Sequence, residues 1–417
     1  MDNDSVNTVM KEVHVIIESA ACTNLNDRYD LLIDSNAIAP QRLMRFGKSC
    51  KNLKLFAHIS TAYVSGKREG LVLEEPLTMG ENMRKVEDEN GPCPFPRLDL
   101  SDELLLLMRS GAFSQDQNID VKYLKKLALE RAESYGWNDP YQMTKAMGEM
   151  VIHEIRGEVP TVIIRPSIIE SCYQDPFPGW IQGNRVADPL ILSFGKGQFP
   201  AYMGDPQVTV DMIPVDLVVN TTIAAIAKHG ISEKPELNVY HAASGDRNPL
   251  KLDDFFEIIY EYFSTSKCEK VNRIRRIKFF NNFNELSEYT KHEIWERHQL
   301  SNSTLGTDEK RAQKQCKAKV AYAEQLCKIY GFIGFMKARF HTGNTQKLLQ
   351  EMSEEELLSF EIDSTLEELT NLSRTEPPRR RDRNKSNHEE NGRRRKAASG
   401  GREVEVERGA ASARSRV

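Results

Sequence analysis

The sequence lacks any apolar run that approaches the roughly twenty residues needed to cross a membrane. Its richest apolar stretch is the short segment 329–336, IYGFIGFM, with Lys328 and Lys337 on either side. We interpret this stretch first as a buried segment of a C-terminal domain, and second as a surface that docks acyl chains or a bilayer interface. The sequence therefore predicts no transmembrane span, and peripheral membrane contact stays open.

Cysteine and histidine give no sign of a metal site. The seven cysteines and nine histidines are scattered without paired metal-ligand spacing. Free thiols in a reducing compartment are therefore expected. Cys172 follows a predicted strand, where a thiolate would be able to carry a covalent intermediate, but no base is recognisable beside it. We favour a structural role for Cys172.

The charge balance does not call for nucleic acid, because 57 basic and 61 acidic residues give a net charge of -4. The end of the chain differs, since residues 374–417 are rich in arginine and poor in large apolar side chains. Such a segment buries too little surface to fold, so we expect a disordered tail. Its basic runs are typical of nucleic-acid binding or nuclear import, and read-through into unrelated coding sequence explains them at least as well.

Three apolar runs indicate a parallel α/β sheet. Residues 13–17, 53–61 and 161–167 have the composition of buried strands, and the last two end in polar residues. Helical spacing between those two runs predicts helices over 124–135 and 141–155. Strand, helix, strand is typical of an α/β protein with a parallel sheet. Ligands bind such sheets at the carboxyl ends of the strands, so the polar residues there are candidate site residues.

Tyr141 and Lys145 are the most informative pair in the chain, and Asp139 is the expected cap of the helix that carries them. Residues four apart share one helix face, where the Lys145 ammonium favours the ionised form of the Tyr141 phenol. Tyr141 is therefore a candidate proton donor near neutral pH. Such a pair also arises by chance, with the tyrosine packed under a helix and the lysine solvated. Agreement with the strand that ends at Ser60 and Thr61 favours the catalytic interpretation.

These elements together resemble the extended form of the short-chain dehydrogenase/reductase superfamily. The resemblance implies that Thr61 orients the substrate, that Tyr141 is the acid/base and that Lys145 is its partner. Asn36, within the helical spacing of residues 29–46, corresponds to the helix asparagine of the superfamily. Asn36 is either a satisfied polar residue of that helix or an organiser of the water and lysine beside the tyrosine.

Longer motifs carry a narrower resemblance, to plant alcohol-forming fatty acyl reductases of the male-sterility type. The likeness runs from about Val13 to about Glu356. It rests on STAYVSGKREGLVLEEPL at 60–77, ERAESYGWNDPYQMTKAMGEMVI at 130–152, VIIRPSIIES at 162–171 and YQDPFPGWIQGNR at 173–185. A further motif, KARFHTGNTQKLLQEMSEEE at 337–356, resembles the C-terminal domain of that family.

The resemblance implies reduction of a long-chain acyl thioester, on coenzyme A or an acyl carrier, through an aldehyde to a primary alcohol. Two NADPH would supply the hydrides, in lipid, wax or pollen-wall (sporopollenin) metabolism. Family members work in plastids or at the endoplasmic reticulum, and this chain shows no targeting segment. The implied substrate contacts are Phe177 and Trp180, and the implied cofactor contacts are Lys145, Tyr141, Ser60, Pro166, Ser167, Ala20 and Ala21.

The amino terminus departs from the family pattern. The first expected strand, 13–17, corresponds to the fourth strand of such a fold, and no glycine-rich turn for a dinucleotide pyrophosphate precedes Thr61. We therefore expect an incomplete doubly wound, Rossmann-like sheet, weakly folded and nearly inactive as written, from a truncated gene model, an alternative transcript or a decayed copy. Glu18 replaces the usual asparagine and Ala39 a common glycine. Glu18 is expected either to repel a cofactor phosphate or to turn toward solvent.

Three segments are expected: a truncated NAD(P)-binding reductase domain over 1–245, a smaller, mainly helical fatty acyl reductase C-terminal domain over 246–373, and the tail over 374–417. Three functions stay open at this point. The first is the fatty acyl reductase, and the second is an extended-superfamily enzyme acting on a sugar nucleotide. The third is a non-catalytic remnant that binds acyl groups or partner proteins, which the absent glycine-rich turn favours.

Overall fold

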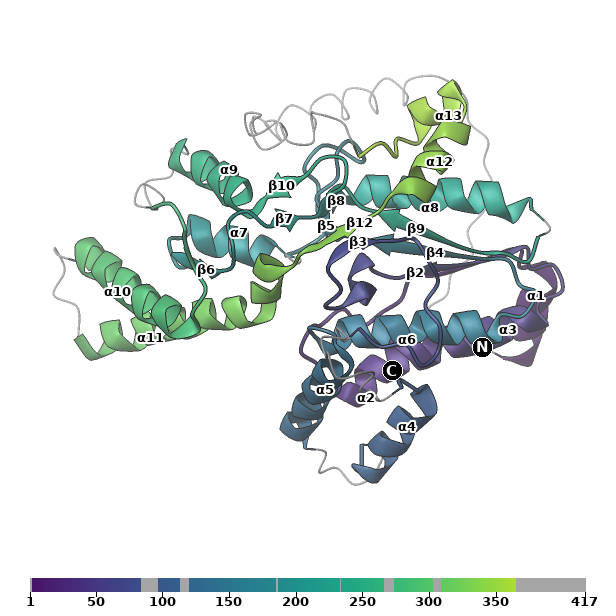
Figure 1. The fold of residues 1–417 in the computed structure, drawn as a ribbon, viewed down its shortest axis with the longest axis horizontal. Coiled ribbons are helices and arrows are strands. Elements are labelled where there is room, and N and C mark those ends of the chain that lie inside the picture. The colour runs from purple at the N-terminus through teal and green to yellow at the C-terminus, as the bar shows by residue number, and fades with distance from the viewer. Residues whose placement is uncertain are drawn as a thin grey trace, which may run out of the picture. The chain divides into compact units, whose positions relative to one another are not determined.

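A parallel sheet forms the centre of the protein (Figure 1). The structure is a computed structural model that describes residues 2–83, 97–112, 120–184, 187–232, 234–265, 274–302 and 309–364. The strands of the sheet, in spatial order and all parallel, are β1 (Val15–Glu18), β2 (Leu55–Ile59), β4 (Thr161–Pro166) and β9 (Leu237–Ala242). Every residue of β4 is buried, as expected for a central parallel strand. The predicted α/β class with a parallel sheet is confirmed.

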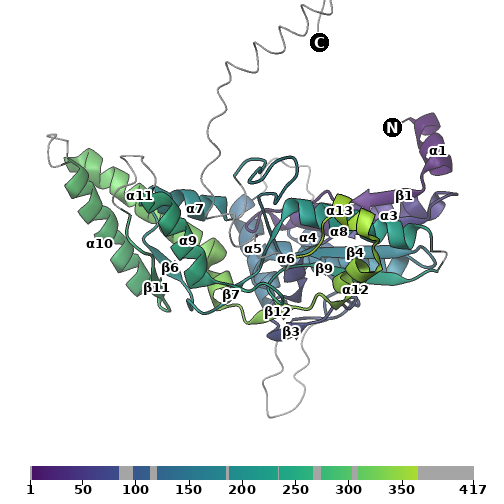
Figure 2. The same ribbon diagram turned by 90° about the horizontal axis from the view of Figure 1, so that it is seen from above.

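Helices cover both faces of this sheet, as in a doubly wound fold. Helices α3 (Ala39–Ser49) and α6 (Pro140–Ile155) lie on one face, and α8 (Val215–Gly230) and α12 (Gly343–Glu351) lie on the other (Figure 1). Helix α8 runs along β4 and β9 (Figure 2). The predicted helix over 141–155 is confirmed as α6, which begins where the carboxylate of Asp139 accepts the backbone N–H of Gln142.

The remaining helices of the described residues lie outside these layers, and several of them are grouped to one side of the sheet (Figure 1). The predicted helix over 124–135 is confirmed as the longer helix α5 (Val121–Tyr135). The others are α1 (Asn3–Glu12), α2 (Tyr29–Ile33), α4 (Leu100–Arg109), α7 (Asp188–Gly195), α9 (Leu252–Thr265), α10 (Phe283–Asn302), α11 (Glu309–Tyr330) and α13 (Glu354–Ser359). No helix within the described residues is long and apolar enough to cross a membrane.

Short strand pairs join distant parts of the chain. Strand β3 (Gly70–Val72) pairs in parallel with β12 (Ala338–Phe340), which brings the 60–77 and 337–356 motifs together. The other pairs are β5 (Ile168–Glu170) with β8 (Met212–Pro214), β7 (Thr209–Val210) with β10 (Leu250–Lys251), and β6 (Ala201–Met203) with β11 (Lys278–Phe280). Residues 1–373 form one compact unit. The domain boundary near 245 stays a prediction, and the predicted tail from 374 lies outside the described residues.

The predicted helix over 29–46 contains a change of helical type. Between α2 and α3 the chain forms the π-helical turn η1 (Asp34–Ile38), with Asn36 buried at its centre.

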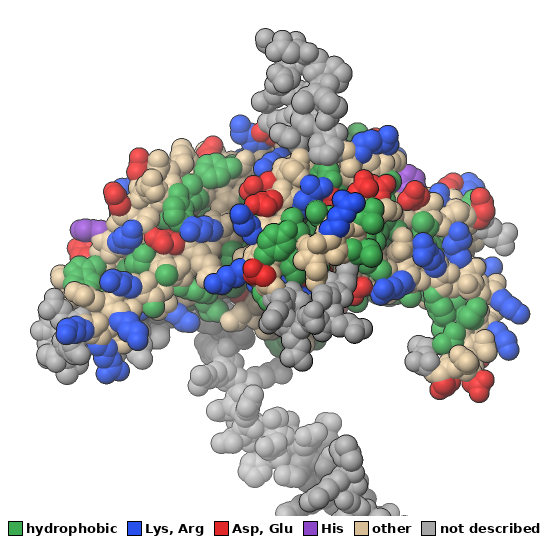
Figure 3. Space-filling model, turned by 90° about the horizontal axis from the view of Figure 1, so that it is seen from below, with side chains coloured by type: hydrophobic (Ala, Val, Ile, Leu, Met, Phe, Trp, Pro, Cys, Tyr) green, Lys and Arg blue, Asp and Glu red, His purple; other side chains and the backbone are tan. Residues whose placement is uncertain are grey.

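On the face shown in Figure 3, basic, acidic and apolar side chains are interspersed. At the edge of the sheet, β1 exposes more than half of the Ile17 side chain.

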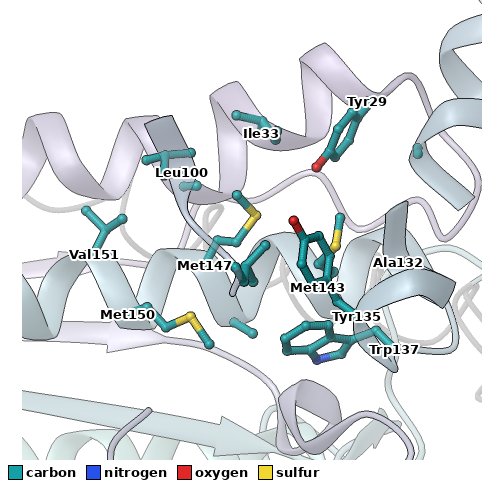
Figure 4. Close-up of a cluster of buried hydrophobic side chains, with 14 of the residues drawn as sticks. Tyr29, Ile33, Leu100, Ala132, Tyr135, Trp137, Met143, Met147, Met150 and Val151 are labelled. Carbon is teal, nitrogen blue, oxygen red and sulfur yellow. The ribbon is translucent and has the colours of Figure 1, made fainter. Parts of the chain in front are cut away.

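Helix α6 is the most deeply buried helix near the site, with every residue from Gln142 to Ile152 buried. Its Met143, Met147 and Met150 pack into an apolar cluster with side chains of α2 and α5 (Figure 4). Within this cluster the hydroxyls of Tyr29 and Tyr135 donate to the buried carboxylate of Glu103, at 2.6 and 2.8 Å. The helix is therefore held by a packed core on the side facing away from the sheet.

Gly148 lets α6 and the π-helical turn come into backbone contact. A Cβ at position 148 would lie well inside van der Waals distance of the Asn36 carbonyl oxygen. That oxygen belongs to the backbone, so it cannot rotate away as a side chain would. The glycine thus sets the spacing between the two segments that carry Tyr141 and Asn36.

We expect Gly148→Ala to lower the free energy of unfolding by about 1–3 kcal/mol, because the methyl group forces the helix away from the turn. Urea denaturation followed by circular dichroism measures the change. Gly230→Ala is the matched control, since no heavy atom lies within 4 Å of a Cβ at that helix end. Equal shifts in the two variants would contradict the close-contact explanation.

Candidate active site

Strand ends and the start of α6 enclose a cavity of about 750 Å³. Ser60 and Thr61 follow β2, Pro166 and Ser167 lie at the end of β4, and Tyr141 stands in the first turn of α6. All five line the cavity. The sequence predicted that these polar strand ends meet near Tyr141, and the structure brings them together.

Tyr141 and Thr61 are neighbours at the polar centre of the cavity, which both side chains line. The backbone N–H of Tyr63 also donates to Thr61 Oγ1, at 3.3 Å. Burial and the nearby Asp139 carboxylate raise the pKa of Tyr141 to about 12, although the neighbouring Thr61 hydroxyl opposes the shift. The phenol therefore keeps its proton near neutral pH. The predicted net lowering of the Tyr141 pKa is wrong for this structure, whereas an effect of Lys145 on the phenolate stays a prediction.

Lys145 lies below the cavity and is 1% exposed. Its ammonium donates to the carbonyl oxygen of Ile59 at 2.8 Å and faces Nε2 of His58 at 3.5 Å. Burial lowers the pKa of Lys145, while Glu18 and Glu149 oppose this by favouring the charged form. The spacing of four places Lys145 on the same face of α6 as Tyr141. The ammonium is thus fixed under the end of β2.

Asn36 is a satisfied polar residue, the first of its two predicted interpretations. Its Nδ2 donates to the carbonyl oxygen of Cys22 and to Thr144 Oγ1, both at 3.0 Å. Its Oδ1 accepts the backbone N–H of Cys22 at 2.9 Å. These bonds join α6 to the loop after β1. A role beside Lys145 stays a prediction.

Glu18 is buried at the end of β1, so the prediction that it faces a phosphate or solvent is wrong. The parallel register places Glu18 beside His58 of β2, and Glu18 Oε2 lies 2.5 Å from His58 Nδ1. Sequence reasoning missed His58. A signal was present, because it is the one ionisable residue inside the apolar strand Leu55–Ile59, directly before the Ser60-Thr61 end.

Arg165 and Glu149 form a second buried contact that the sequence analysis missed. Arg165 Nε donates to Glu149 Oε1 at 3.0 Å, and Nη2 donates to Oε2 at 2.6 Å. Nη2 also reaches the carbonyl oxygen of Glu75 at 2.9 Å. Both side chains are almost fully buried. The pair ties α6 to β4 by two parallel charge-assisted bonds.

The cavity extends from the polar centre into an apolar region. Trp180 lines it, as predicted, whereas Phe177 is 59% exposed and lies outside the lining, so its substrate contact stays a prediction. Tyr330, Phe332 and Ile333, at the end of α11 and in the 3-10 helix η3 (Gly331–Phe335), complete the wall. Gly331, Ile333 and Gly334 are buried whereas Phe335 is 44% exposed, so the predicted buried segment is packed inside the protein only in part.

The predicted cofactor contacts differ in position. Ala21, Ser60, Pro166 and Ser167 line the cavity, whereas Ala20 is exposed outside the lining. Ser60 Oγ is buried and has no hydrogen-bond partner among the described residues. A buried hydroxyl of this kind requires a partner from a bound molecule or water. The cavity therefore has an unused polar group where the nicotinamide end of a cofactor is expected.

Two further residues near the cavity bear on its chemistry. Burial and the neighbouring Asp188 raise the pKa of Glu170, which lines the cavity, to about 8. Glu170 is therefore mainly uncharged at neutral pH, and sequence reasoning missed it. The buried thiol of Cys172 donates to the Phe177 carbonyl oxygen at 2.9 Å. That bond agrees with the structural role favoured for Cys172.

Among the described residues, one cluster of acidic and histidine side chains has the spacing of possible metal ligands. His292, Glu293 and Glu296 on α10 bring potential ligand atoms within 4.8 Å of one another. Glu293 is already engaged by Arg275 at 2.9 Å and by Arg297 at 3.3 Å. The group is accounted for by these ion pairs.

Comparison with known proteins identifies the family. Residues 1–222 match the family described as Male sterility protein, an NAD-binding domain, and this chain belongs to that family. It is 43% identical over 370 residues to the chloroplastic fatty acyl-CoA reductase 2 of Arabidopsis thaliana, covering 86% of this chain and 60% of that protein. It is 37% identical over 259 residues to the alcohol-forming fatty acyl-CoA reductase of Simmondsia chinensis, covering 61% and 50%. The chain thus spans 50 to 60% of the length of these two relatives.

A pH-dependent effect on stability follows from Asp139, because burial raises the pKa of this cap to about 7. Its ordinary value of 3.8 applies in the unfolded chain, so the stability it contributes is present below about pH 4 and is lost as the pH rises through 7. Asp139→Asn keeps the cap oxygen and removes the titration. We expect the variant to gain on the order of 1–4 kcal/mol relative to the parent between pH 4 and pH 7.5.

Urea denaturation at those two pH values measures the difference. Asp99→Asn is the control, since Asp99 caps α4 in the same way through the backbone N–H of Ser101. Asp139→Asn is also expected to lower the pKa of Tyr141, which the Asp139 charge raises. Tyrosine ¹³Cζ NMR reports that pKa, with the signal assigned by its loss in Tyr141→Phe. A stability difference between Asp139→Asn and the parent that does not change with pH would contradict the raised pKa of Asp139.

Proposed function

We propose that this chain carries the catalytic centre of a reductase that converts a long-chain acyl thioester, through an aldehyde, to a primary alcohol. The observation that carries this proposal is that the hydroxyl-bearing Tyr141 and Thr61 line one cavity, whose far wall is apolar. The hydroxyls suit a carbonyl that is being reduced. The apolar wall, with Trp180 and Phe332, suits a hydrocarbon chain.

The names of the relatives support the substrate. Both relatives are called fatty acyl-CoA reductases, and one is called alcohol-forming. The word chloroplastic in the name of the Arabidopsis protein supports action in the plastid. We extend the proposal to acyl-CoA as the carrier form and to pollen-wall or wax lipids as the use of the product. The neutral state of Glu170 near pH 7 supports an uncharged acyl chain beside it.

NADPH is the proposed cofactor, and a nicotinamide supplies the hydride when it is bound. The residues present fit its nicotinamide end, because the unpartnered Ser60 hydroxyl, Ala21 and the Pro166-Ser167 turn surround the cavity next to Tyr141. These residues would hold the nicotinamide and its ribose. The described residues contain no glycine-rich turn for the pyrophosphate, so the proposal assigns contacts only at this end.

The side chains of this chain perform the remaining steps. Thr61 and Tyr141 donate hydrogen bonds to the carbonyl oxygen and stabilise the negative charge that develops there, first on the thioester and then on the aldehyde. Expulsion of the thiol separates the two reductions. The Tyr141 phenol then protonates the alkoxide, which is a stronger base than the phenolate. The buried Lys145 ammonium places a positive charge beneath the resulting phenolate.

The direct test incubates the purified protein with ¹⁴C-labelled long-chain acyl-CoA and NADPH and follows labelled fatty alcohol. Tyr141→Phe is expected to lower kcat/KM by about 10²–10⁴-fold, because the proton donor is lost while the ring remains. Tyr123→Phe, on an exposed part of α5, is the control and is expected to retain full activity. Turnover of sugar nucleotides instead of acyl-CoA would overturn the proposal.

A fusion gives a second arm. The amino-terminal segment of the Arabidopsis relative is joined ahead of this chain, which tests whether such a segment adds a pyrophosphate site. Alcohol from both proteins supports the proposed function for the chain as printed. Alcohol from the fusion alone supports the proposed roles of Tyr141 and Thr61 while assigning cofactor affinity to the added residues. Alcohol from neither protein contradicts the function.

A further inference from the structure

Three ionisable side chains form a continuous buried row beneath the cavity. Glu18 at the end of β1 contacts His58 of β2, and His58 faces Lys145 of α6. All three are 4% exposed or less. Burying this many charged groups is costly unless they are paired, so the row requires an explanation beyond packing.

The chemistry of the row fixes the direction of its hydrogen bonds. Burial and the Lys145 ammonium lower the pKa of His58, so the ring is neutral at neutral pH. A carboxylate only accepts, so the ring nitrogen beside Glu18, Nδ1, carries the hydrogen. Nε2 is then left with its lone pair toward the Lys145 ammonium, 3.5 Å away. Glu18 therefore selects the tautomer that accepts from Lys145.

The contacts of the row also indicate which carboxylate compensates the charge of the buried Lys145 ammonium. The charged groups that face Lys145 and His58 from the packed elements are Glu18 of β1 and Glu149 of α6. Glu149 is already bound in two places by Arg165 of β4. Within the described part of the chain no arginine pairs with Glu18, which contacts His58 and acts on Lys145 through its charge. Its carboxylate is thus the group that compensates the buried ammonium.

Two of the three N–H donors of the Lys145 ammonium are already hydrogen-bonded, so one remains. One hydrogen bond goes to the Ile59 carbonyl oxygen and one to His58, and an ammonium has three donors. Helix geometry places Tyr141 on the same face, one turn toward the cavity. The third N–H has no acceptor among the described residues.

We propose that Glu18 and His58 are positioning residues for Lys145: they keep its ammonium charged and direct its free N–H toward the Tyr141 side of the cavity. The proposal rests on the proposed function only where it links Lys145 to proton donation by Tyr141. The hydrogen-bonded row itself is a property of this chain, with or without turnover.

The first test measures Lys145 directly by ¹⁵Nζ-lysine NMR against pH, with the signal assigned by its loss in Lys145→Met. Glu18→Gln is expected to move the deprotonation midpoint of Lys145 to lower pH, because the compensating charge is removed. Glu18→Asp keeps that charge and is expected to restore most of the midpoint. Glu103→Gln is the matched control, since it neutralises another buried carboxylate, one that contacts Tyr29, Arg131 and Tyr135. A Lys145 midpoint in folded Glu18→Gln equal to that of the parent overturns the proposal.

A measurement on the unsubstituted protein covers the case in which Glu18→Gln does not fold. Histidine ¹⁵N NMR distinguishes the two tautomers of His58, with the signal assigned in His58→Gln. Hydrogen on Nδ1 across neutral pH supports the proposal. Hydrogen on Nε2, or a ring that is positively charged at pH 7, overturns it.

The activity arm separates this proposal from the proposed function. Glu18→Gln is expected to lower kcat about tenfold with KM for acyl-CoA unchanged, and to shift the alkaline limb of the kcat profile to lower pH. Glu103→Gln is expected to leave the position of that limb unchanged. Alcohol formation by the parent with an unshifted limb in Glu18→Gln overturns the positioning role. Absence of alcohol from both the parent and the fusion contradicts the proposed function, and the two NMR measurements still test the roles of Glu18 and His58.

Discussion

The site depends on the buried ion pair between Arg165 and Glu149, because this contact fixes how α6 is rotated against the sheet. A buried pair of this kind gains little net stability over apolar packing, yet losing one partner costs about 3–5 kcal/mol, since a charge is left uncompensated. Its two parallel hydrogen bonds are also directional. Rotating α6 by a single residue would turn Glu149 about 100° away from Arg165. The pair therefore permits one rotation of the helix.

That rotation orders three side chains along one face of α6. Tyr141, Lys145 and Glu149 are spaced by four residues, so they point in similar directions at successive depths. The first reaches the cavity, the second the end of β2, and the third the middle of the sheet at β4. Polarity follows depth in an unusual order, because the two deeper positions, Lys145 and Glu149, carry the charged side chains. The helix can bear this only because each charge meets a partner from a neighbouring strand.

Much of this arrangement is readable from sequence. The runs at 53–61 and 161–167 and the helical spacing at 141–155 specify the strands, the helix and their polar ends, because each rests on local periodicity. Glu18 and His58 are different. They lie 40 residues apart, and the contact depends on a strand register that periodicity does not give. The predicted lowering of the Tyr141 pKa is wrong for a related reason. The pKa depends on burial, which periodicity does not give and which outweighs the charge on the same helix face.

At the apolar end of the cavity, residues of the 60–77 motif contact residues in and next to the 337–356 motif. Tyr63, two residues after Thr61, packs edge-on against Phe332 and Phe340, with ring centroids 6.3 and 5.4 Å apart. Glu74 accepts backbone N–H groups from His241 and Asn344, at 3.0 and 2.6 Å, and so ties the 60–77 motif to the C-terminal one. Because Phe332 also lines the cavity, the C-terminal residues are part of its wall. The strand end that places Thr61 at the polar centre therefore also positions, through Tyr63, the apolar wall opposite it.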